Sequence, residues 1–314
     1  MTIWEAFKAG FGFLSVVPVG ITMEGIEALM KRLYMYPVVG FCLGLLIGLI
    51  TFAAVLILPT PLTVIAIMLA TYGIIWFNHL DGIADMGDGM TAHGSLEKKR
   101  KALKDMAIGV GGVAFVVLLL LLFYASLSAL ENVAGGIYGA HMLPLMGMLS
   151  FMETTQFMET VPFMGLYSCV YDVVCASGLS ETLKSAIAPA AFMAVTVILA
   201  ETCGKQAMLT IATFGKSFSE GLGSMTIAGG TRKNFVIGIL FTAIVSFALL
   251  GVVGLAALLL STLVALFILK ISNRHFKGLN GDGIGAANEV GRVVTIASVA
   301  VILFLINGGV AWML

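Results

Sequence analysis

The sequence predicts an all-α, polytopic integral membrane protein. Of its 314 residues, 60% are hydrophobic and only 11% are charged, and the mean hydropathy is +1.06. A soluble domain usually carries about 25% charged residues, so this composition excludes one. The 17 basic and 17 acidic side chains balance, which gives no reason to expect a nucleic-acid partner. The lipid bilayer is the environment that this chain needs.

Apolar runs predict seven membrane-spanning helices, each close to the roughly 20 residues that a span requires. The candidates are 35–58, 62–79, 107–130, 186–203, two helices within 235–270, and 293–312. The run 235–270 is too long for one span, and we expect it to turn near Gly251 and Gly254, where glycine tolerates a tight connection. Pro59 ends the first span because proline cannot continue a helix.

The basic residues predict the orientation. Apart from Lys184, every Lys and Arg falls in the N-terminal segment, in the loop after the second span, in 205–233 or in 270–292. The positive-inside rule makes these four segments cytoplasmic, and seven spans thread through them without conflict. We therefore expect a multi-pass protein of the cell membrane whose N-terminus and site loops are cytoplasmic.

The remaining parts predict one membrane-embedded domain over residues 1–314. The N-terminus, about 3–18, is expected to form an interfacial helix. The segment of about 131–183 contains no Lys or Arg and is apolar and rich in Met, which places it on the outer side. A hairpin within that segment would raise the count to nine spans, our second choice, and would leave the orientation unchanged.

An aspartate cluster, "HLDGIADMGDG" at residues 79–89, follows the second span. Asp81, Asp85 and Asp88 are spaced i, i+4, i+7, which places three carboxylates along one stripe of a helix. Neighbouring carboxylates repel, and Mg²⁺ neutralises them while binding substrate phosphate oxygens. The alternative is a solvated acidic loop that caps a helix. Carboxylates at a membrane edge favour the functional interpretation.

Basic and acidic residues recur in three further polar places on the same face. "SLEKKRKALKDMAIGVGG" (95–112) supplies Arg100 and Lys104, then Asp105; a cationic face beside a metal suits a transferring phosphoryl group, although a topogenic basic loop is the alternative. Residues 201–224 supply Lys216 and Glu220, and the glycine-rich segment 273–289 supplies Asp282. Polar segments that each pair a carboxylate with a base indicate a shared site.

Four motifs together resemble the cobalamin synthase family, adenosylcobinamide-GDP ribazoletransferase. They are LDGIADMGDG, Arg100 with LKDMAIGVGG, Gly204-Lys205 with SEGLGS, and GLNGDGIGAANE. With "FLSVVPVG" and "YPVVGFCLGLLIG" near the N-terminus, the resemblance runs from about residue 11 to 292 in order. Three departures are Lys205 in place of an arginine, Asn280 in place of a threonine, and a longer stretch at 150–183.

The resemblance implies a transferase of cobalamin biosynthesis. It would join adenosylcobinamide-GDP to α-ribazole, or to its 5′-phosphate, and release GMP through metal-dependent attack of a ribose hydroxyl on the pyrophosphate. The implied Mg²⁺ ligands are Asp81, Asp85, Asp88 and Asp105. The implied catalytic residues are Asp88, Asp282, Arg100 and Lys104, with the general base left open between the two aspartates. The implied substrate-binding residues are His79, Lys216, Glu220, Gly281 and Asn288.

Two alternatives stay open at this level. "DMGDGMTAH" (85–93) resembles the opening motif of the CDP-alcohol phosphotransferases, but His93 replaces an arginine and the later aspartate pair of that family is missing. A cation transporter would line an ion path with the three aspartates. Against it, no internal repeat is visible and the predicted spans hold almost no charge.

Overall fold

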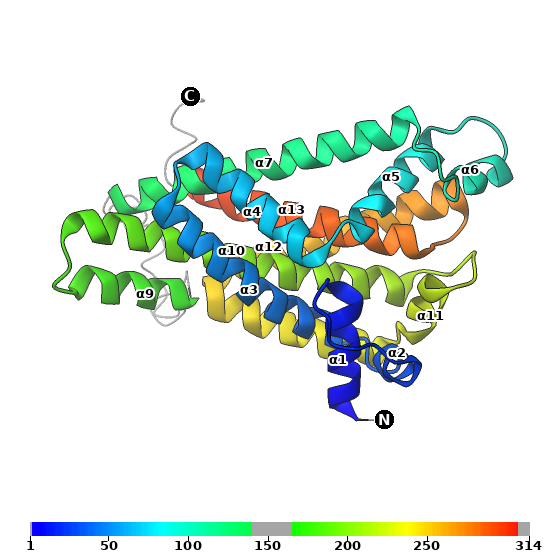
Figure 1. Ribbon diagram of the computed structural model, residues 1–314, viewed down its shortest axis with the longest axis horizontal. Coiled ribbons are helices and arrows are strands. Elements are labelled where there is room, and N and C mark those ends of the chain that lie inside the picture. The colour runs from blue at the N-terminus through cyan, green and yellow to red at the C-terminus, as the bar shows by residue number, and fades with distance from the viewer. Residues whose placement is uncertain (1, 140–164, 307–314) are drawn as a thin grey trace, which may run out of the picture.

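The computed structural model describes residues 2–139 and 165–306 (Figure 1). Their regular structure is helical, with one isolated bridge between Ser217 and Leu279, so the predicted all-α class is confirmed. The helices are α1 (Ile3–Leu14), α2 (Met23–Met30), α3 (Met35–Ile57), α4 (Thr60–Ile75), α5 (Asn78–Thr91), α6 (Leu96–Ala102), α7 (Val110–Gly139), α9 (Gly165–Ala176), α10 (Glu181–Phe214), α11 (Leu222–Gly229), α12 (Arg232–Phe276) and α13 (Gly281–Ile306).

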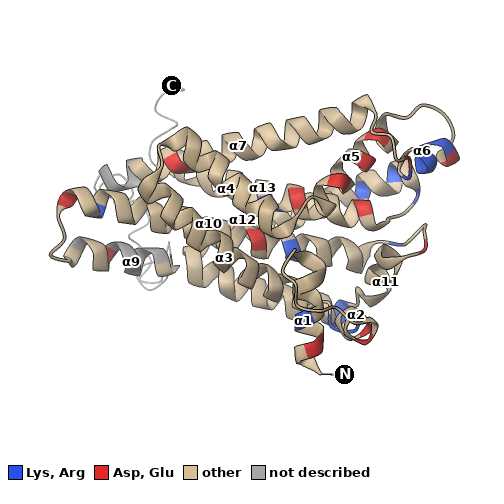
Figure 2. Ribbon diagram, in the orientation of Figure 1, with Lys and Arg blue, Asp and Glu red and all other residues tan. Residues whose placement is uncertain are grey.

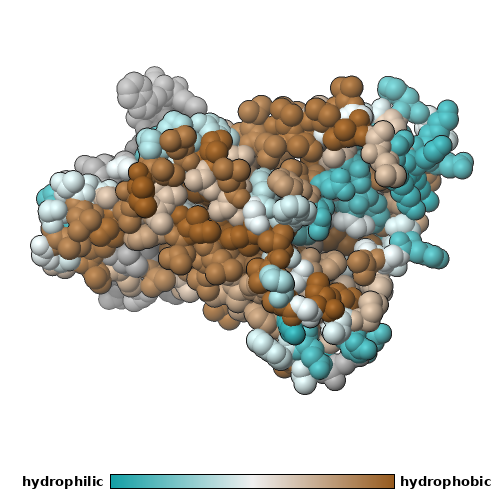
Figure 3. All heavy atoms as spheres, in the orientation of Figure 1, coloured by the Kyte–Doolittle hydropathy of each residue, from teal (hydrophilic) through white to brown (hydrophobic). Residues whose placement is uncertain are grey.

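Long apolar helices make up the body of the protein. Among the described residues, α3, α7, α10, α12 and α13 are long and apolar enough to cross a membrane, which gives five spans, or six if α4 and α5 form one span bent by 96°. Apolar side chains cover much of the visible surface between the two ends (Figure 3). Charged residues gather at the end that carries α5 and α6 (Figure 2). The chain is a polytopic helical bundle with one conspicuously polar end.

Helix α12 reverses direction in its middle. A straight helix of its 45 residues would be about 68 Å long. At Gly251 the backbone leaves the helical region with φ 54°, and a Cβ added to Gly254 would collide with the carbonyl of Ser246, which a straight helix would hold about 12 Å away. Phe235, near its start, packs edge to face on Phe214 with 5.1 Å between ring centroids. The N–H of Leu279, just beyond its end, donates to the carbonyl of Lys216 at 2.8 Å. Both ends of α12 therefore lie beside the end of α10, and the predicted turn is confirmed.

The span count and the orientation stay predictions. Counted with the two halves of α12 and with α4, the described helices provide seven candidate crossings. Residues 140–164, where the alternative hairpin would form, lie outside the described residues. The predicted interfacial helix corresponds to α1, whose start is fixed by a reciprocal capping box between Thr2 and Glu5.

Three predicted span boundaries were wrong. Helix α10 continues to Phe214 instead of ending at 203, α13 begins at Gly281 instead of 293, and α4 ends at Ile75, before the bend into α5. The expectation that the spans hold almost no charge was also wrong. Lys205 and Arg292 were placed in cytoplasmic segments just outside the spans, but both are buried inside these helices and are paired there.

Helix α10 is the central element of the bundle and packs against α3, α7, α12 and α13. Its contact with α3 is a backbone contact, because Gly44 and Gly48 of α3 face it. A Cβ on Gly44 would lie 2.9 Å from Cα of Ile198, and one on Gly48 would lie 3.1 Å from the carbonyl of Ala194. Small residues spaced by four allow membrane helices to approach this closely. This packing holds one face of α10 against α3 and leaves another for α13.

We predict that Gly254→Ala destabilises the protein by about 1–3 kcal/mol, because the new methyl group overpacks the reversal in α12. The measurement is thermal unfolding of the purified protein in detergent. The matched control is Gly73→Ala in α4, since a Cβ there meets nothing within 4 Å. Equal stabilities of the two variants would contradict the hairpin.

Candidate active site

The aspartate stripe lies on α5, which is bent sharply away from α4. After α4 the chain turns at Trp76, which has φ 66°, and α5 runs at 96° to α4. Helix α5 packs on the start of α13 so tightly that a Cβ on Gly82 would lie 2.5 Å from the carbonyl oxygen of Asp282. This contact brings the carboxylates of Asp85 and Asp282, from opposite ends of the sequence, to one place.

The carboxylates of α5 and α13 influence one another. Burial and the neighbouring carboxylates of Asp282, Asp81 and Asp88 raise the pKa of Asp85 to about 7. Lys104, which is exposed, is the cation that acts on Asp282. The amide of Asn280 donates to Asp282 while its oxygen accepts the N–H of Gly283 at 3.2 Å, which caps α13. Asparagine is as good a cap as threonine, so this departure from the family pattern preserves the local structure.

Asp88 faces away from this group and caps α7. Its Oδ2 accepts the N–H of Gly109 at 2.6 Å, and its Oδ1 accepts the N–H of Gly112 at 2.8 Å. Both amides belong to the first turn of α7, where a carboxylate also meets the positive end of the helix dipole. A side chain at either glycine would collide with the Asp88 carboxylate. The capping alternative to a metal ligand therefore describes Asp88 in this structure.

Arg100 and Asp105 are also engaged in local structure. Arg100 donates from Nε (3.0 Å) and Nη2 (2.8 Å) to the carbonyl of Phe276 and lies 4.5 Å from the ring centroid of Phe218, so it ties α6 to the end of α12. Asp105 accepts the N–H of Ala107 at 3.2 Å. Asp88 and Asp105 line the same groove, of about 500 Å³, but Asp81 and Asp85 do not.

The predicted four-residue magnesium site is not preformed. Among the described residues, no group of three or more His, Cys, Asp or Glu side chains is arranged to hold a metal ion. Asp81 and Asp85, one helical turn apart and near Asp282, still fit Mg²⁺. This ion typically takes one or two carboxylates and completes its octahedron with water and substrate phosphate oxygens. Burial is the largest cause of the raised pKa of Asp85, and repulsion by the neighbouring carboxylates adds to it; a bound cation would offset that repulsion.

The other predicted polar loop reaches the same end of α13. Gly223 packs on the start of α13, where a Cβ would lie 2.5 Å from the N atom of Gly281. The side chains of Lys216 and Glu220, in the loop before it, are exposed. The structure thus brings together Asp81, Asp85, Asp282 and Lys104, and it holds the loop of Lys216 and Glu220 beside Gly281.

Residues His79 and Asn288, predicted to bind substrate, belong to a buried polar network that the sequence analysis missed. Its ion pairs join Arg292 Nε to Glu201 Oε1 (2.5 Å), Arg292 Nη1 to Glu289 Oε2 (2.7 Å) and Lys205 Nζ to Glu201 Oε2 (3.2 Å). All four charged side chains are at most 1% exposed, and their charges cancel. The network contains Tyr72, His79, Glu201, Lys205, Asn288, Glu289 and Arg292.

The spacing of charged residues along two helices is the sequence signal that could have revealed part of this network. Glu201 and Lys205 are spaced i, i+4, and Glu289 and Arg292 are spaced i, i+3, so each pair shares one helix face. The spacing does not reveal that the two faces meet. That contact depends on the packing of α10 against α13, which pairs Arg292 with Glu201.

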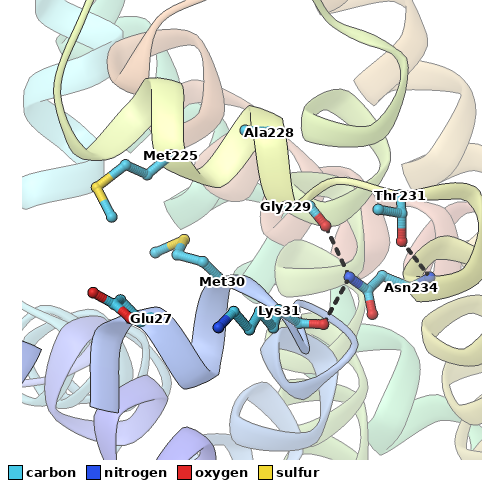
Figure 4. Close-up of a pocket in the computed structure, with 8 residues that line it drawn as sticks. All are labelled: Glu27, Met30, Lys31, Met225, Ala228, Gly229, Thr231 and Asn234. Atoms are coloured by element: carbon cyan, nitrogen blue, oxygen red, sulfur yellow. Dashed lines mark hydrogen bonds between the residues drawn. The ribbon is translucent and has the colours of Figure 1, made fainter. Parts of the chain in front are cut away.

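A second groove, of about 510 Å³, lies between α2, α11 and the start of α12 (Figure 4). Met30 and Met225 face its interior, and the amide of Asn234 donates to the carbonyl of Gly229 at 2.8 Å. None of the predicted site residues lines this groove. We therefore place the candidate active site at α5, α13 and the loops beside them.

Fold and site define a class, a polytopic membrane protein whose polar end presents a carboxylate cluster with nearby basic side chains. The family model described as cobalamin-5-phosphate synthase matches residues 6–166 and 161–300. The chain belongs to the cobalamin-5-phosphate synthase family. This membership favours the resemblance over the lipid phosphotransferase and transporter alternatives.

Named relatives cover the whole chain. Proteins called adenosylcobinamide-GDP ribazoletransferase from Methanosarcina barkeri and Methanosarcina mazei are 46% and 44% identical, each over 98% of both chains. The protein of that name from Methanococcoides burtonii is 36% identical over 98% of this chain and 97% of its own length. No solved structure matches.

We predict that Asp88→Ala lowers stability by about 1–2 kcal/mol, because it removes the cap of α7. Thermal unfolding in detergent containing EDTA is the measurement. Asp81→Ala serves as the control, since Asp81 is exposed and makes no side-chain hydrogen bond within the described chain. If the two variants unfold at the same temperature, Asp88 does not cap α7.

Proposed function

We propose that this protein is an adenosylcobinamide-GDP ribazoletransferase, an enzyme of cobalamin biosynthesis. It joins adenosylcobinamide-GDP to α-ribazole, or to α-ribazole 5′-phosphate, and forms adenosylcobalamin, or its 5′-phosphate, together with GMP. The observation that carries the proposal is full-length similarity to proteins of that name, at up to 46% identity among those compared. The convergence of Asp85, Asp282 and Lys104 supports it from the structure.

The reaction replaces one ester of phosphorus by another. A ribose hydroxyl oxygen of α-ribazole attacks the phosphorus on the corrinoid side of the pyrophosphate, and a new P–O bond forms as the bond to GMP breaks. The hydroxyl proton leaves to a base, and negative charge builds on the departing GMP. Such a transfer needs positioning and neutralisation of charge more than covalent catalysis.

The carboxylates of Asp81 and Asp85 are the ligands that we assign to Mg²⁺. When bound, the ion would polarise the pyrophosphate and offset charge on the leaving group. Asp88 and Asp105 belong to the originally expected ligand set, but their hydrogen bonds to α7 and to Ala107 favour structural roles. Oxygen ligands and a local excess of negative charge support this assignment.

We assign the acceptance of the hydroxyl proton and the binding of the phosphate oxygens to other side chains. We assign the hydroxyl proton to Asp282 over Asp88, because both oxygens of Asp88 already accept N–H groups of α7. Lys104 and Lys216 are exposed cations on the loops beside α13 and suit the phosphate oxygens. Arg100 fits a positioning role, because two of its N–H groups already donate to the carbonyl of Phe276. To Glu220, which is exposed, and to Gly281, at the start of α13, we assign contacts with the substrate.

The polar end suits a site that is open to the cytoplasm. Most basic residues of the chain lie in the segments that the positive-inside rule assigns to that side. A corrinoid nucleotide is large and charged, so it would approach from water. We propose that the protein lies in the cell membrane with α5, α6 and the start of α13 at its cytoplasmic face.

We predict that Asp85→Asn lowers the rate of GMP release by at least about 100-fold, because it removes a ligand that neutralises transition-state charge. The assay supplies adenosylcobinamide-GDP and α-ribazole to purified protein, with Mg²⁺ or with EDTA, and measures GMP and the corrinoid product. EDTA should abolish both products in the wild type.

Asp172→Asn is the control, because Asp172 is an exposed carboxylate on α9. It should keep wild-type rates. A folded wild type that makes no product from either form of α-ribazole would overturn the proposed function. Full activity of Asp85→Asn would overturn the metal assignment alone.

A further inference from the structure

The side-chain amide of Asn288 is held by two charged neighbours inside the bundle. Lys205 Nζ lies 2.8 Å from Asn288 Oδ1, and Glu289 Oε1 lies 2.9 Å from Asn288 Nδ2. A lysine ammonium can only donate hydrogen bonds, and an ionised carboxylate can only accept them. The amide oxygen must therefore face Lys205 and the amide nitrogen must face Glu289. Two independent partners therefore fix the orientation of this amide.

This orientation determines the state of His79. The second N–H of the Asn288 amide points to Nδ1 of His79, at 3.2 Å. Since the amide nitrogen is only a donor, Nδ1 must accept and carries no proton. A neutral imidazole then keeps its proton on Nε2.

The free edge of His79 is the one that carries Nε2. The side chain is 9% exposed, whereas Asn288 on its Nδ1 side is fully buried. In the described part of the chain, Nε2 of His79 has no hydrogen-bond partner. It is also absent from the fully buried side-chain atoms that lack one, so it is not sealed inside the bundle. The Nε2–H group is thus the only polar atom of the ring that is free to meet a ligand.

We propose that Lys205 and Asn288 are positioning residues that hold His79 as the Nε2–H tautomer, and that this N–H donates a hydrogen bond to a phosphate oxygen of the bound substrate. The ligand class rests on the proposed function, and the tautomer rests on the network alone. His79 lies on α5, and its backbone packs on Gly285 of α13, about one helical turn from Asp282. It acts as a neutral donor and takes no proton from the ribose hydroxyl. The role is electrostatic, as in an oxyanion hole.

The first test is the ¹⁵N spectrum of histidine-labelled protein in lipid nanodiscs at neutral pH. The protonated and unprotonated nitrogens of an imidazole have widely separated shifts, and the signals that disappear in His79→Gln belong to His79. We expect a single tautomer with the proton on Nε2. A proton on Nδ1, or on both nitrogens, overturns the proposal whether or not the protein is active.

The second test separates a donor from a base. The amide nitrogen of glutamine can stand near the position of Nε2, whereas that of asparagine stands near Nδ1. We expect His79→Gln to keep kcat within about 10-fold of the wild type, and His79→Asn to lower kcat by about 100-fold, the typical cost of losing one oxyanion donor. Equal losses in the two variants would overturn the donor role.

The third test reverses the tautomer through a neighbour that the substrate does not touch. Asn288→Asp keeps the size of the side chain and a partner for Lys205, but it presents an acceptor to His79. Because the new carboxylate lies beside both Glu289 and His79, we expect a proton on Nδ1 of His79 in the ¹⁵N spectrum and a lower kcat, with a smaller change in KM. An unchanged spectrum in the folded variant would show that Asn288 does not set the tautomer. If wild-type protein turns over neither acceptor, the proposed function fails, and the spectra still decide the tautomer.

Discussion

The ion pair between Glu201 of α10 and Arg292 of α13 determines how the interior of the bundle is arranged. Taking these charges out of water costs several kcal/mol for each ion, and the cost is offset only when every charge has a well-placed partner. Glu289 and Lys205 provide those partners, and Tyr72 donates to Glu289 at 3.0 Å. A shift of α13 along α10 would leave buried charges unpaired. The register of the two helices is therefore strongly specified.

The register of α13 against α10 also positions the candidate active site. Helix α13 carries Asp282 in its first turn and reaches Asn288 and Arg292 about two to three turns later, so fixing these two residues also fixes the position of Asp282 against α5. The two polar groups differ in their charge balance. The interior network is neutral, whereas Asp81, Asp85 and Asp282 carry an excess of negative charge. The first suits a rigid scaffold, and the second suits a cation and a phosphate ligand.

The sequence predicted the bundle, the split in α12 and the helix that carries the aspartate stripe, because apolar length and helical spacing are local properties. It did not predict which face each side chain uses. Asp88 was grouped with Asp81 and Asp85 by spacing, but it caps α7 by accepting the N–H of Gly109, 21 residues later. The ends of α10 and α13 were missed for a related reason. A charge ends a predicted span, yet Lys205 and Arg292 stay inside because their partners come from other helices.

The central claim is that the cation site consists of Asp81 and Asp85 beside Asp282, with Asp88 serving the fold. Binding of Mn²⁺ in place of Mg²⁺, measured by electron paramagnetic resonance of the purified protein, tests it directly. We predict one bound Mn²⁺ per chain in the wild type, at least about 10-fold weaker binding in Asp85→Asn, and nearly unchanged binding in folded Asp88→Asn. Loss of Mn²⁺ from Asp88→Asn with retention in Asp85→Asn would contradict it.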